Sequence, residues 1–192
     1  MPVPTLCVNF YGGPSVGKST MCAHVFAELK WRGINCEMSR EYAKDVVWEG
    51  SLDILDDQLH VFGEQYHRLH RLVGKVDIIL TDSPLLLSLI YGKKLPQEFR
   101  DLVLHQFNSF NNFNIVLTRQ KRFNPAGRVH NEEQSHRLDD EICNLLKDLN
   151  VAYICLPGER DAVNDALSFI NMAYYTMRKR TGREFFLPEE DQ

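Results

Sequence analysis

"FYGGPSVGKST", residues 10 to 20, contains Gly12, four further residues, and then Gly17-Lys18-Ser19. This is the P-loop pattern, in which glycines let successive backbone N–H groups curve around phosphate oxygens. The apolar run at 5–11 predicts a buried strand before the loop, and the positive end of the following helix adds to anion binding. We expect the nucleotide to be contacted by the whole loop: Gly12, Gly13, Pro14, Ser15, Val16, Gly17, Lys18, Ser19 and Thr20.

The order of predicted elements indicates an α/β fold. Continuous apolar runs predict strands at 5–11, 34–39, 76–82, 113–119 and 151–156. Helical periodicity predicts helices at 17–32, 52–73, 84–91, 97–110, 132–149 and 161–178. Strands that are apolar throughout need helices on both faces, so we expect a doubly wound, parallel, five-stranded sheet of the P-loop NTPase type. Ligands of such sheets bind beyond the carboxyl ends of the strands.

Composition predicts one domain over 1–180 and a polar tail over 181–192. The chain has 192 residues, 44% of them hydrophobic, and a net charge of −4 that does not by itself indicate nucleic-acid binding. Its five cysteines form no CxxC pair, which is typical of reduced core thiols in a cytosolic protein. Without a signal peptide pattern or an apolar run of about 18 residues, we expect a cytoplasmic protein with no membrane partner.

The stretch "IILTDSPL" places Asp82 at the end of a predicted strand beside the P-loop strand. There Asp82 can bind Mg²⁺ through water, together with Ser19, while Lys18 reaches the β- and γ-phosphates. Alternatively, Asp82 only caps the following helix. Ser83 stands where many ATP-hydrolysing motors have a glutamate, and the Asp-x-x-Gly and Asn-Lys-x-Asp motifs of small GTPases are absent. Transfer to an organic acceptor is therefore favoured over transfer to water.

Residues for an acceptor are expected in "EMSREYAKD" and on the 52–73 helix. Glu41 is the first candidate for the base that takes a hydroxyl proton, with Asp82 as competitor. Arg40 can hold an acceptor phosphate or face the transferring group, although an exposed Arg-Glu pair at a helix start is the alternative. Gln58 and Gln65 share a helix face and can read a base edge, with Ser83 nearby, unless they simply face solvent.

The segment 119–131 predicts a basic lid. Arg119, Lys121, Arg122 and Arg128 occur in it without an acidic residue before Asn131. Arginines on a loop beside the phosphates can neutralise charge in the transition state and exclude water on closure. Arg128 is the first candidate and Arg122 the second. A solvated basic loop is the alternative.

The order of P-loop, "SREYAKD", "IILTDSP" and "NPAGR" resembles the P-loop kinase family that includes the ribosylnicotinamide kinase domains of bacterial NAD-regulatory proteins. The resemblance extends over about residues 5–175. It implies ATP and Mg²⁺ as cofactors, a nucleoside-like acceptor and a nucleotide-kinase fold. Similar phage proteins include kinases that phosphorylate 5-hydroxymethyluracil within DNA, and the placement of Arg40 and Glu41 resembles that in phage polynucleotide kinases.

The leading hypothesis is an ATP-dependent kinase that phosphorylates a hydroxyl of a nucleoside-type acceptor. A 5-hydroxymethylpyrimidine in phage DNA and a free nucleoside or nucleotide are both open as acceptors. The basic lid and "RKRTGR" at 178–183 favour DNA, whereas the acidic balance of the chain does not. A hypothesis from another class is an acceptor-independent P-loop ATPase or switch.

Overall fold

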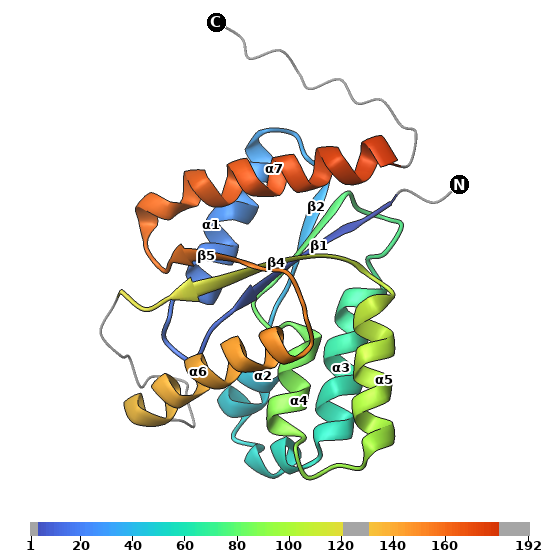
Figure 1. Ribbon diagram of the computed structural model, residues 1–192, viewed down its shortest axis with the longest axis vertical. Coiled ribbons are helices and arrows are strands. Elements are labelled where there is room, and N and C mark those ends of the chain that lie inside the picture. The colour runs from blue at the N-terminus through green and yellow to red at the C-terminus, as the bar shows by residue number, and fades with distance from the viewer. Residues whose placement is uncertain (1–3, 121–130, 181–192) are drawn as a thin grey trace, which may run out of the picture.

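The computed structural model describes residues 4–120 and 131–180. Its centre is a parallel sheet of five strands in the order β2-β3-β1-β4-β5 (Figure 1). The strands are β1 Leu6–Tyr11, β2 Cys36–Ser39, β3 Ile78–Thr81, β4 Asn111–Thr118 and β5 Ile154–Pro157. The predicted doubly wound parallel sheet is confirmed, and β3 lies directly beside the P-loop strand β1.

Helices cover both faces of the sheet, and each face has its own core. On one face lie α1 Lys18–Trp31 and α7 Val163–Arg180. On the other lie α3 Gln58–His70, α4 Ser88–Tyr91, α5 Gln97–Asn108 and α6 Glu132–Asp148. Successive residues of β1 alternate between the two cores: Val8 and Phe10 belong to the first, and Cys7 and Tyr11 to the second. This alternation explains why the strand is apolar at every position except Asn9, whose buried amide donates to the Asn112 and Asn114 side chains.

Several element boundaries differ from the sequence predictions. The predicted 52–73 helix is a 3₁₀ turn at Leu52–Asp56 followed by α3, because the Asp57 carboxylate accepts a hydrogen bond from His60 N (3.1 Å) and starts a new helix. The helix α2 Tyr42–Glu49 was not among the predicted helices, although the alternative for Arg40 and Glu41 placed a helix start there. The stretch 84–91 is a 3₁₀ turn at Leu85–Leu87 and then α4.

The ends of α6 show one confirmed prediction and one shift. The helix begins at Glu132 as predicted, and Asn131 caps it in a capping box with Gln134. The strand predicted from 151 begins only at Ile154, because Val151 N still bonds to Leu146 O (2.9 Å) behind a left-handed turn at Asn150. A further 3₁₀ turn, Arg160–Ala162, leads from β5 into α7.

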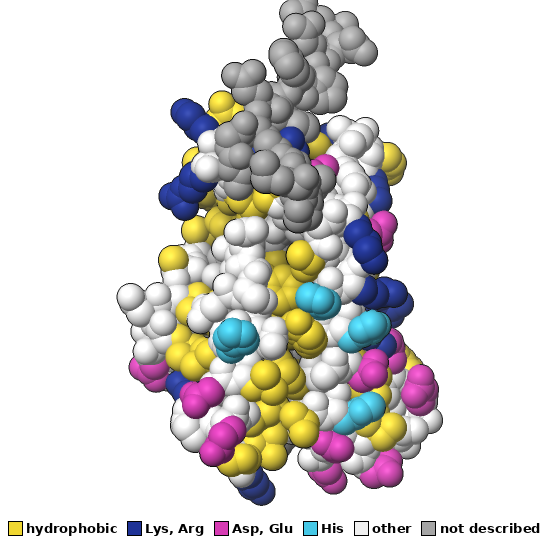
Figure 2. Space-filling model, turned by 90° about the vertical axis from the view of Figure 1, so that its right-hand side faces the viewer, with side chains coloured by type: hydrophobic (Ala, Val, Ile, Leu, Met, Phe, Trp, Pro, Cys, Tyr) yellow, Lys and Arg dark blue, Asp and Glu magenta, His cyan; other side chains and the backbone are white. Residues whose placement is uncertain are grey.

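The five cysteines differ in how deeply they are buried. Cys7, Cys22 and Cys36 are buried thiols, as expected, but Cys143 is only half-buried and Cys155 is exposed. Among the described residues, no helix is long and apolar enough to span a membrane. Figure 2 shows one face of the molecule, on which most described acidic side chains lie in the lower half and Lys and Arg side chains are scattered from the upper to the lower end.

Candidate functional site

The loop between β1 and α1 has the backbone that the P-loop pattern requires. Gly12 and Gly17 have φ values of +139° and +111°, which side-chain-bearing residues rarely adopt. A Cβ on Gly12 would also lie 2.7 Å from Val16 Cγ1. The Lys18 ammonium folds back over the loop and donates to Gly12 O (2.6 Å) and Gly13 O (3.0 Å). The loop therefore presents Lys18 and the start of α1 at the carboxyl edge of the sheet.

Asp82 and Glu41 lie side by side next to this loop. Ser39 pairs with Thr81 at the ends of β2 and β3, so the residues that follow these strands are neighbours. The Asp82 carboxylate, 5% exposed, accepts a hydrogen bond from Glu41 N at 3.1 Å. The alternative that Asp82 caps the helix following it is wrong, because its bond goes to the residue that precedes α2.

The donor set suits Mg²⁺ rather than a metal held by protein alone. Asp82 provides a carboxylate and Ser19 a hydroxyl, which are hard oxygen ligands. The described part of the chain contains no group of three or more His, Cys, Asp or Glu side chains that could hold a metal. Mg²⁺ commonly takes one or two protein ligands and completes its shell with phosphate oxygens and water, which fits these two residues.

The two glutamines of α3 have different surroundings. Gln65 is 4% exposed; its Oε1 accepts from Tyr42 N (3.0 Å) and its Nε2 donates to Ser39 Oγ (3.4 Å). Its amide thus holds the start of α2 against the end of β2, and the solvent-facing alternative is wrong for this residue. Gln58 donates to Leu55 O (2.5 Å) and lines a cavity. Their contact with an acceptor stays a prediction.

That cavity, called the larger cavity below, has a volume of about 590 Å³ and begins at Pro14 of the P-loop. Its apolar wall comes from α2, α3 and α4, with Val47, Val61 and Ile90 among its residues. Its polar side chains are Glu41, Lys44, Asp56, Gln58, Tyr91, Lys93 and Lys94. Of the other predicted acceptor residues, Arg40 is exposed and Ser83 half-buried, and neither lines this cavity.

Tyr91 contributes a hydroxyl that stays protonated. Although 43% of the residue is exposed, burial raises the pKa of Tyr91 above its ordinary value. The negative charges of Glu41 and Glu141 raise the pKa further. The larger cavity therefore contains a neutral phenol that can donate a hydrogen bond.

A smaller cavity of about 260 Å³ lies on the other side of the P-loop. It is lined by Gly17, Thr20 and His24 from the P-loop and α1, and by Gly158, Glu159 and Arg160 from the segment after β5. Gly158 N donates to Thr118 O (2.9 Å), and a Cβ on Gly158 would lie 2.0 Å from Val16 O. The segment after β5, "LPGERDA", thus lies directly against the P-loop.

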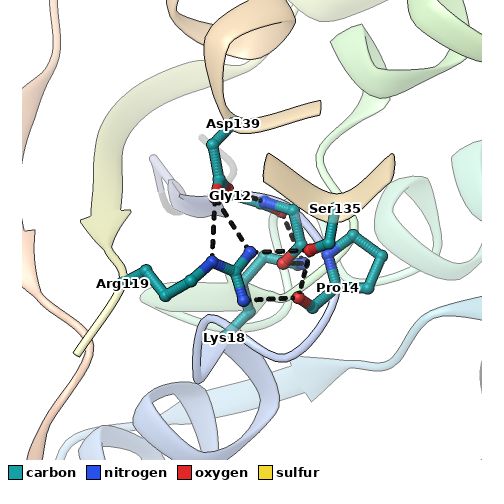
Figure 3. A network of polar contacts seen from close by, with 7 residues as sticks. Gly12, Pro14, Lys18, Arg119, Ser135 and Asp139 are labelled. Carbon is teal, nitrogen blue, oxygen red and sulfur yellow. Dashed lines mark hydrogen bonds and ion pairs between the residues drawn. The ribbon is translucent and has the colours of Figure 1, made fainter. Parts of the chain in front are cut away.

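The predicted lid residues Arg122 and Arg128 lie outside the described residues. Arg119, expected to begin the basic loop around the phosphates, has another role in this structure. Its Nε and Nη2 donate to Asp139 Oδ2 (3.1 and 2.8 Å), Nη1 donates to Pro14 O (3.0 Å), and Nη2 also donates to Ser135 Oγ (2.6 Å), as Figure 3 shows. Its guanidinium is therefore bound to the P-loop backbone and to α6.

Sequence reasoning missed Ser135 and Asp139. They are four residues apart on α6, so they share one face of that helix. Ser135 Oγ donates to Pro14 O (2.6 Å), and the Asp139 carboxylate accepts from Gly13 N (2.5 Å). A serine and an aspartate on an otherwise amphipathic helix carry no signature, and their i, i+4 spacing was the one available signal.

Comparison with protein families gives a match over most of the chain. The family model described as "AAA domain" (AAA_28) matches residues 7–162, from β1 to the turn after β5. The chain belongs to this AAA domain family. The matched range includes the P-loop, Glu41, Asp82, the lining of the larger cavity and that of the smaller cavity except for Val163.

Among curated proteins, this AAA domain is 36% identical to protein RecA of Campylobacter jejuni subsp. doylei over 84 residues, which are 40% of the chain and 24% of RecA. RecA of the Wolbachia of Drosophila simulans matches at 36% over the same shares. The chain thus spans about a quarter of the length of the curated relatives it matches.

Solved structures share the fold of the AAA domain at low sequence identity. NadR in complex with NR has a TM-score of 0.62 at 19% identity, over 97% of this chain and 52% of that one. Thymidylate kinase from Ehrlichia chaffeensis has a TM-score of 0.53 at 11% identity, over 94% and 100%. Mycobacterium tuberculosis APS kinase CysC has a TM-score of 0.51 at 13% identity, over 91% and 99%. The fold is therefore a P-loop NTPase fold that matches nucleotide kinases.

Proposed function

We propose that this AAA domain is an ATP-dependent kinase that transfers the γ-phosphate to a hydroxyl of a nucleoside-type acceptor. The observation that carries the proposal is a pair of cavities on opposite sides of one P-loop, one against Gly17 and the other against Pro14 and Glu41. An enzyme that hydrolyses ATP needs room for one organic ligand. Two cavities that meet at the phosphate-binding loop provide room for a donor and an acceptor.

In this proposal the smaller cavity takes the base of ATP and the P-loop takes the phosphates. Lys18 contacts the β- and γ-phosphates. Ser19 and Asp82 would hold Mg²⁺, which would neutralise charge on the phosphate oxygens. Glu41 accepts the proton of the acceptor hydroxyl as the bond from that oxygen to the γ-phosphorus forms and the bond from the γ-phosphorus to the bridging oxygen of ADP breaks. Arg122 and Arg128 remain the proposed lid arginines.

The larger cavity suits a ring with polar edges. Its volume of about 590 Å³ lies within the usual range for small-molecule sites, roughly 300–1,000 Å³. Apolar side chains can pack on a base, Gln58 and Tyr91 can meet its polar edge, and Lys44 and Lys94 bring positive charge for a phosphate. A nucleotide within DNA fits these features if the base is flipped out of the stack.

We favour a 5-hydroxymethylpyrimidine in phage DNA as acceptor, because the resemblance to phage kinases and the lysines of the larger cavity agree. The free nucleoside or nucleotide is the alternative. It is supported by the fold shared with nucleotide kinases and by the scattered basic residues on the face in Figure 2. A cytoplasmic location, in the host cell for a phage protein, belongs to the same proposal.

The test uses γ-labelled ATP and a panel of acceptors: hydroxymethyluracil DNA, unmodified DNA of the same sequence, free nucleosides and nucleoside monophosphates. Label in the hydroxymethyluracil DNA, absent with Lys18→Ala, supports the favoured acceptor. Label only in free nucleosides or monophosphates supports the alternative. Release of labelled phosphate at one rate with every acceptor, and no labelled product, overturns the kinase proposal in favour of an ATPase.

A further inference from the structure

The P-loop is held from the side of α6 by three polar side chains, which we call the α6 clasp: Arg119, Ser135 and Asp139 (Figure 3). They bind the first half of the loop, at Gly13 N and Pro14 O. The Arg119 guanidinium uses all three nitrogens and reaches Asp139, Ser135 and the Pro14 carbonyl at once. The hydrogen bonds from the clasp to the loop thus reach its backbone, at Gly13 N and Pro14 O.

The clasp is tightly packed and mostly buried. Ser135 is fully buried, and the side chains of Arg119 and Asp139 are 11% and 25% exposed. A Cβ on Gly13 would lie 2.4 Å from Ser135 O, so the backbone of α6 touches the loop. Breaking one partner of a buried ion pair leaves an uncompensated charge, and this makes the pair sensitive to single substitutions.

The peptide that the clasp holds also holds Lys18. Asp139 accepts from the Gly13 N–H, and the Gly12 carbonyl of the same peptide group accepts from Lys18 Nζ at 2.6 Å. Asp139 and Lys18 are thus connected through the peptide group between Gly12 and Gly13. Pro14, whose carbonyl binds Arg119 and Ser135, also begins the larger cavity.

Charge explains why an aspartate beside a phosphate-binding loop needs Arg119. A carboxylate at Gly13 N would repel a triphosphate bound to the same loop, because charges a few ångströms apart interact strongly where water is partly excluded. Arg119 lies on the Asp139 carboxylate at 2.8 Å and neutralises it. The pair as a whole keeps the directional hydrogen bond to Gly13 without adding net negative charge.

We infer that Asp139 is a positioning residue that orients the Gly13 peptide and thereby the Lys18 ammonium, and that Arg119 compensates its charge so that nucleotide still binds. The inference about Lys18 in phosphoryl transfer rests on the proposed function. The inference about charge compensation concerns nucleotide affinity alone and is independent of any acceptor.

The experiment compares the wild type with Asp139→Asn, Arg119→Met and the double variant. Affinity is measured with a fluorescent ATP analogue, turnover with labelled ATP and the best acceptor of the panel, and folding by thermal unfolding. We expect Asp139→Asn to lower kcat about tenfold, with affinity kept within about threefold, because the neutral amide still accepts from Gly13 N but loses its ionic partner. We expect Arg119→Met to weaken nucleotide binding about tenfold or more, because an unpaired carboxylate then faces the phosphates.

The double variant separates charge from packing. Removing both charges should restore nucleotide affinity to near the wild-type value while kcat stays low. Arg119→Lys, which keeps the charge and loses the forked geometry, should bind nucleotide better than Arg119→Met, and it replaces the double variant if that protein does not fold. If the double variant binds nucleotide as weakly as Arg119→Met does, charge compensation is overturned. If the double variant does not fold, the same conclusion follows when Arg119→Lys binds nucleotide no more tightly than Arg119→Met.

The matched control is another half-buried Arg–Asp pair, Arg178 to Asp77 (3.4 Å), with side chains 15% and 21% exposed. Asp77 directly precedes β3, so this pair lies at the opposite edge of the sheet from the P-loop. Asp77→Asn should lower the unfolding temperature and leave kcat and nucleotide affinity near their wild-type values. If Asp77→Asn lowers kcat as much as Asp139→Asn, the positioning role is overturned. If the wild type transfers no phosphate to any acceptor, the proposed function fails, while the affinity measurements still decide on charge compensation.

Discussion

The two sides of the P-loop are built differently. On the side of the smaller cavity, backbone packs on backbone: Gly17 and Gly158 are in contact, with no space for a side chain between them. On the side of the larger cavity, side chains from α2, α3 and α4 make the walls, with Glu41 and three lysines among them. Changes on the backbone side should therefore affect nucleotide binding as such. Changes on the side-chain side should affect which acceptor is used and how fast.

The largest effect that separates the two sides is expected from Glu41→Gln. Loss of a general base typically lowers a rate by about 10² to 10⁴, so kcat should fall by about 10² or more. Nucleotide affinity should stay near that of the wild type, because Glu41 lines only the larger cavity. Labelled transfer and binding of a fluorescent ATP analogue measure the two quantities.

Asp82→Asn is the comparison for that result. If Asp82 holds Mg²⁺, this variant should require more Mg²⁺ for the same rate, whereas Glu41→Gln should not. A Glu41→Gln protein with near-normal kcat, beside an Asp82→Asn protein that has lost transfer at every Mg²⁺ concentration, would instead assign the base to Asp82.

The next effect concerns the backbone side, at Gly158. A Cβ at this position would lie 2.0 Å from Val16 O, so Gly158→Val must displace either the P-loop or the segment after β5. Loss of one charge-assisted hydrogen bond to phosphate costs about 1.5–3 kcal/mol, so we expect ATP affinity to fall about 100-fold. Isothermal titration with a non-hydrolysable ATP analogue measures the change.

Gly63→Ala is the control for that substitution. Gly63 lies inside α3 with nothing within 4 Å of an added Cβ. Alanine there should stabilise the protein by about 0.5–1 kcal/mol and leave ATP affinity unchanged. Unchanged ATP affinity in Gly158→Val would mean that the smaller cavity is not the nucleotide side.

These two sides were not equally visible in the sequence. The P-loop and the positions after β2 and β3 could be predicted, because a short motif and the geometry of parallel strands place Lys18, Glu41 and Asp82 at one edge. The α6 clasp could not, because Asp139 meets Gly13 across 126 positions of sequence and only packing of α6 brings them together. Arg119 was assigned to the phosphates for the same reason, since its charge was visible and its partner was not.

The 52–73 segment shows a second limit. Its apolar spacing predicts one long helix, but Asp57 starts α3 afresh, and the resulting turn at Leu52–Asp56 contributes Leu55 and Asp56 to the larger cavity. A cap that competes with helix continuation is decided locally by one hydrogen bond, which periodicity does not register. The lysines of the larger cavity are likewise brought together from α2 and from the segment after α4.

A smaller effect, on the side-chain side, distinguishes acceptor classes. Lys44→Ala and Lys94→Ala should each raise the acceptor KM about tenfold for a phosphate-bearing acceptor, because a charge-assisted contact is lost. For an uncharged nucleoside the KM should hardly change. With DNA as acceptor, the dependence of KM on salt should also become shallower. Lys75→Ala, an exposed lysine just before β3, is the control and should change neither value. If Lys44→Ala and Lys94→Ala change the KM of charged and uncharged acceptors by the same factor, these lysines do not have a phosphate-binding role.

The smallest effect is expected at Tyr91, where it tests whether the larger cavity hydrogen-bonds its ligand. Burial and the charges of Glu41 and Glu141 raise the pKa of Tyr91 above its ordinary value of 10.0, so the phenol stays protonated beyond the pH at which a free tyrosine ionises. Because the raised pKa belongs to the folded state, this group lowers stability only as pH rises above 10.

Tyr91→Phe should raise the acceptor KM by about threefold to tenfold, the value of one neutral hydrogen bond, and should leave ATP affinity unchanged. In the wild type the acceptor KM should be flat between pH 7 and pH 10, because Tyr91 is neutral across that range. A rise of the wild-type KM near pH 10 that is absent in Tyr91→Phe would show that the phenol ionises at its ordinary pKa, which would contradict the raised pKa.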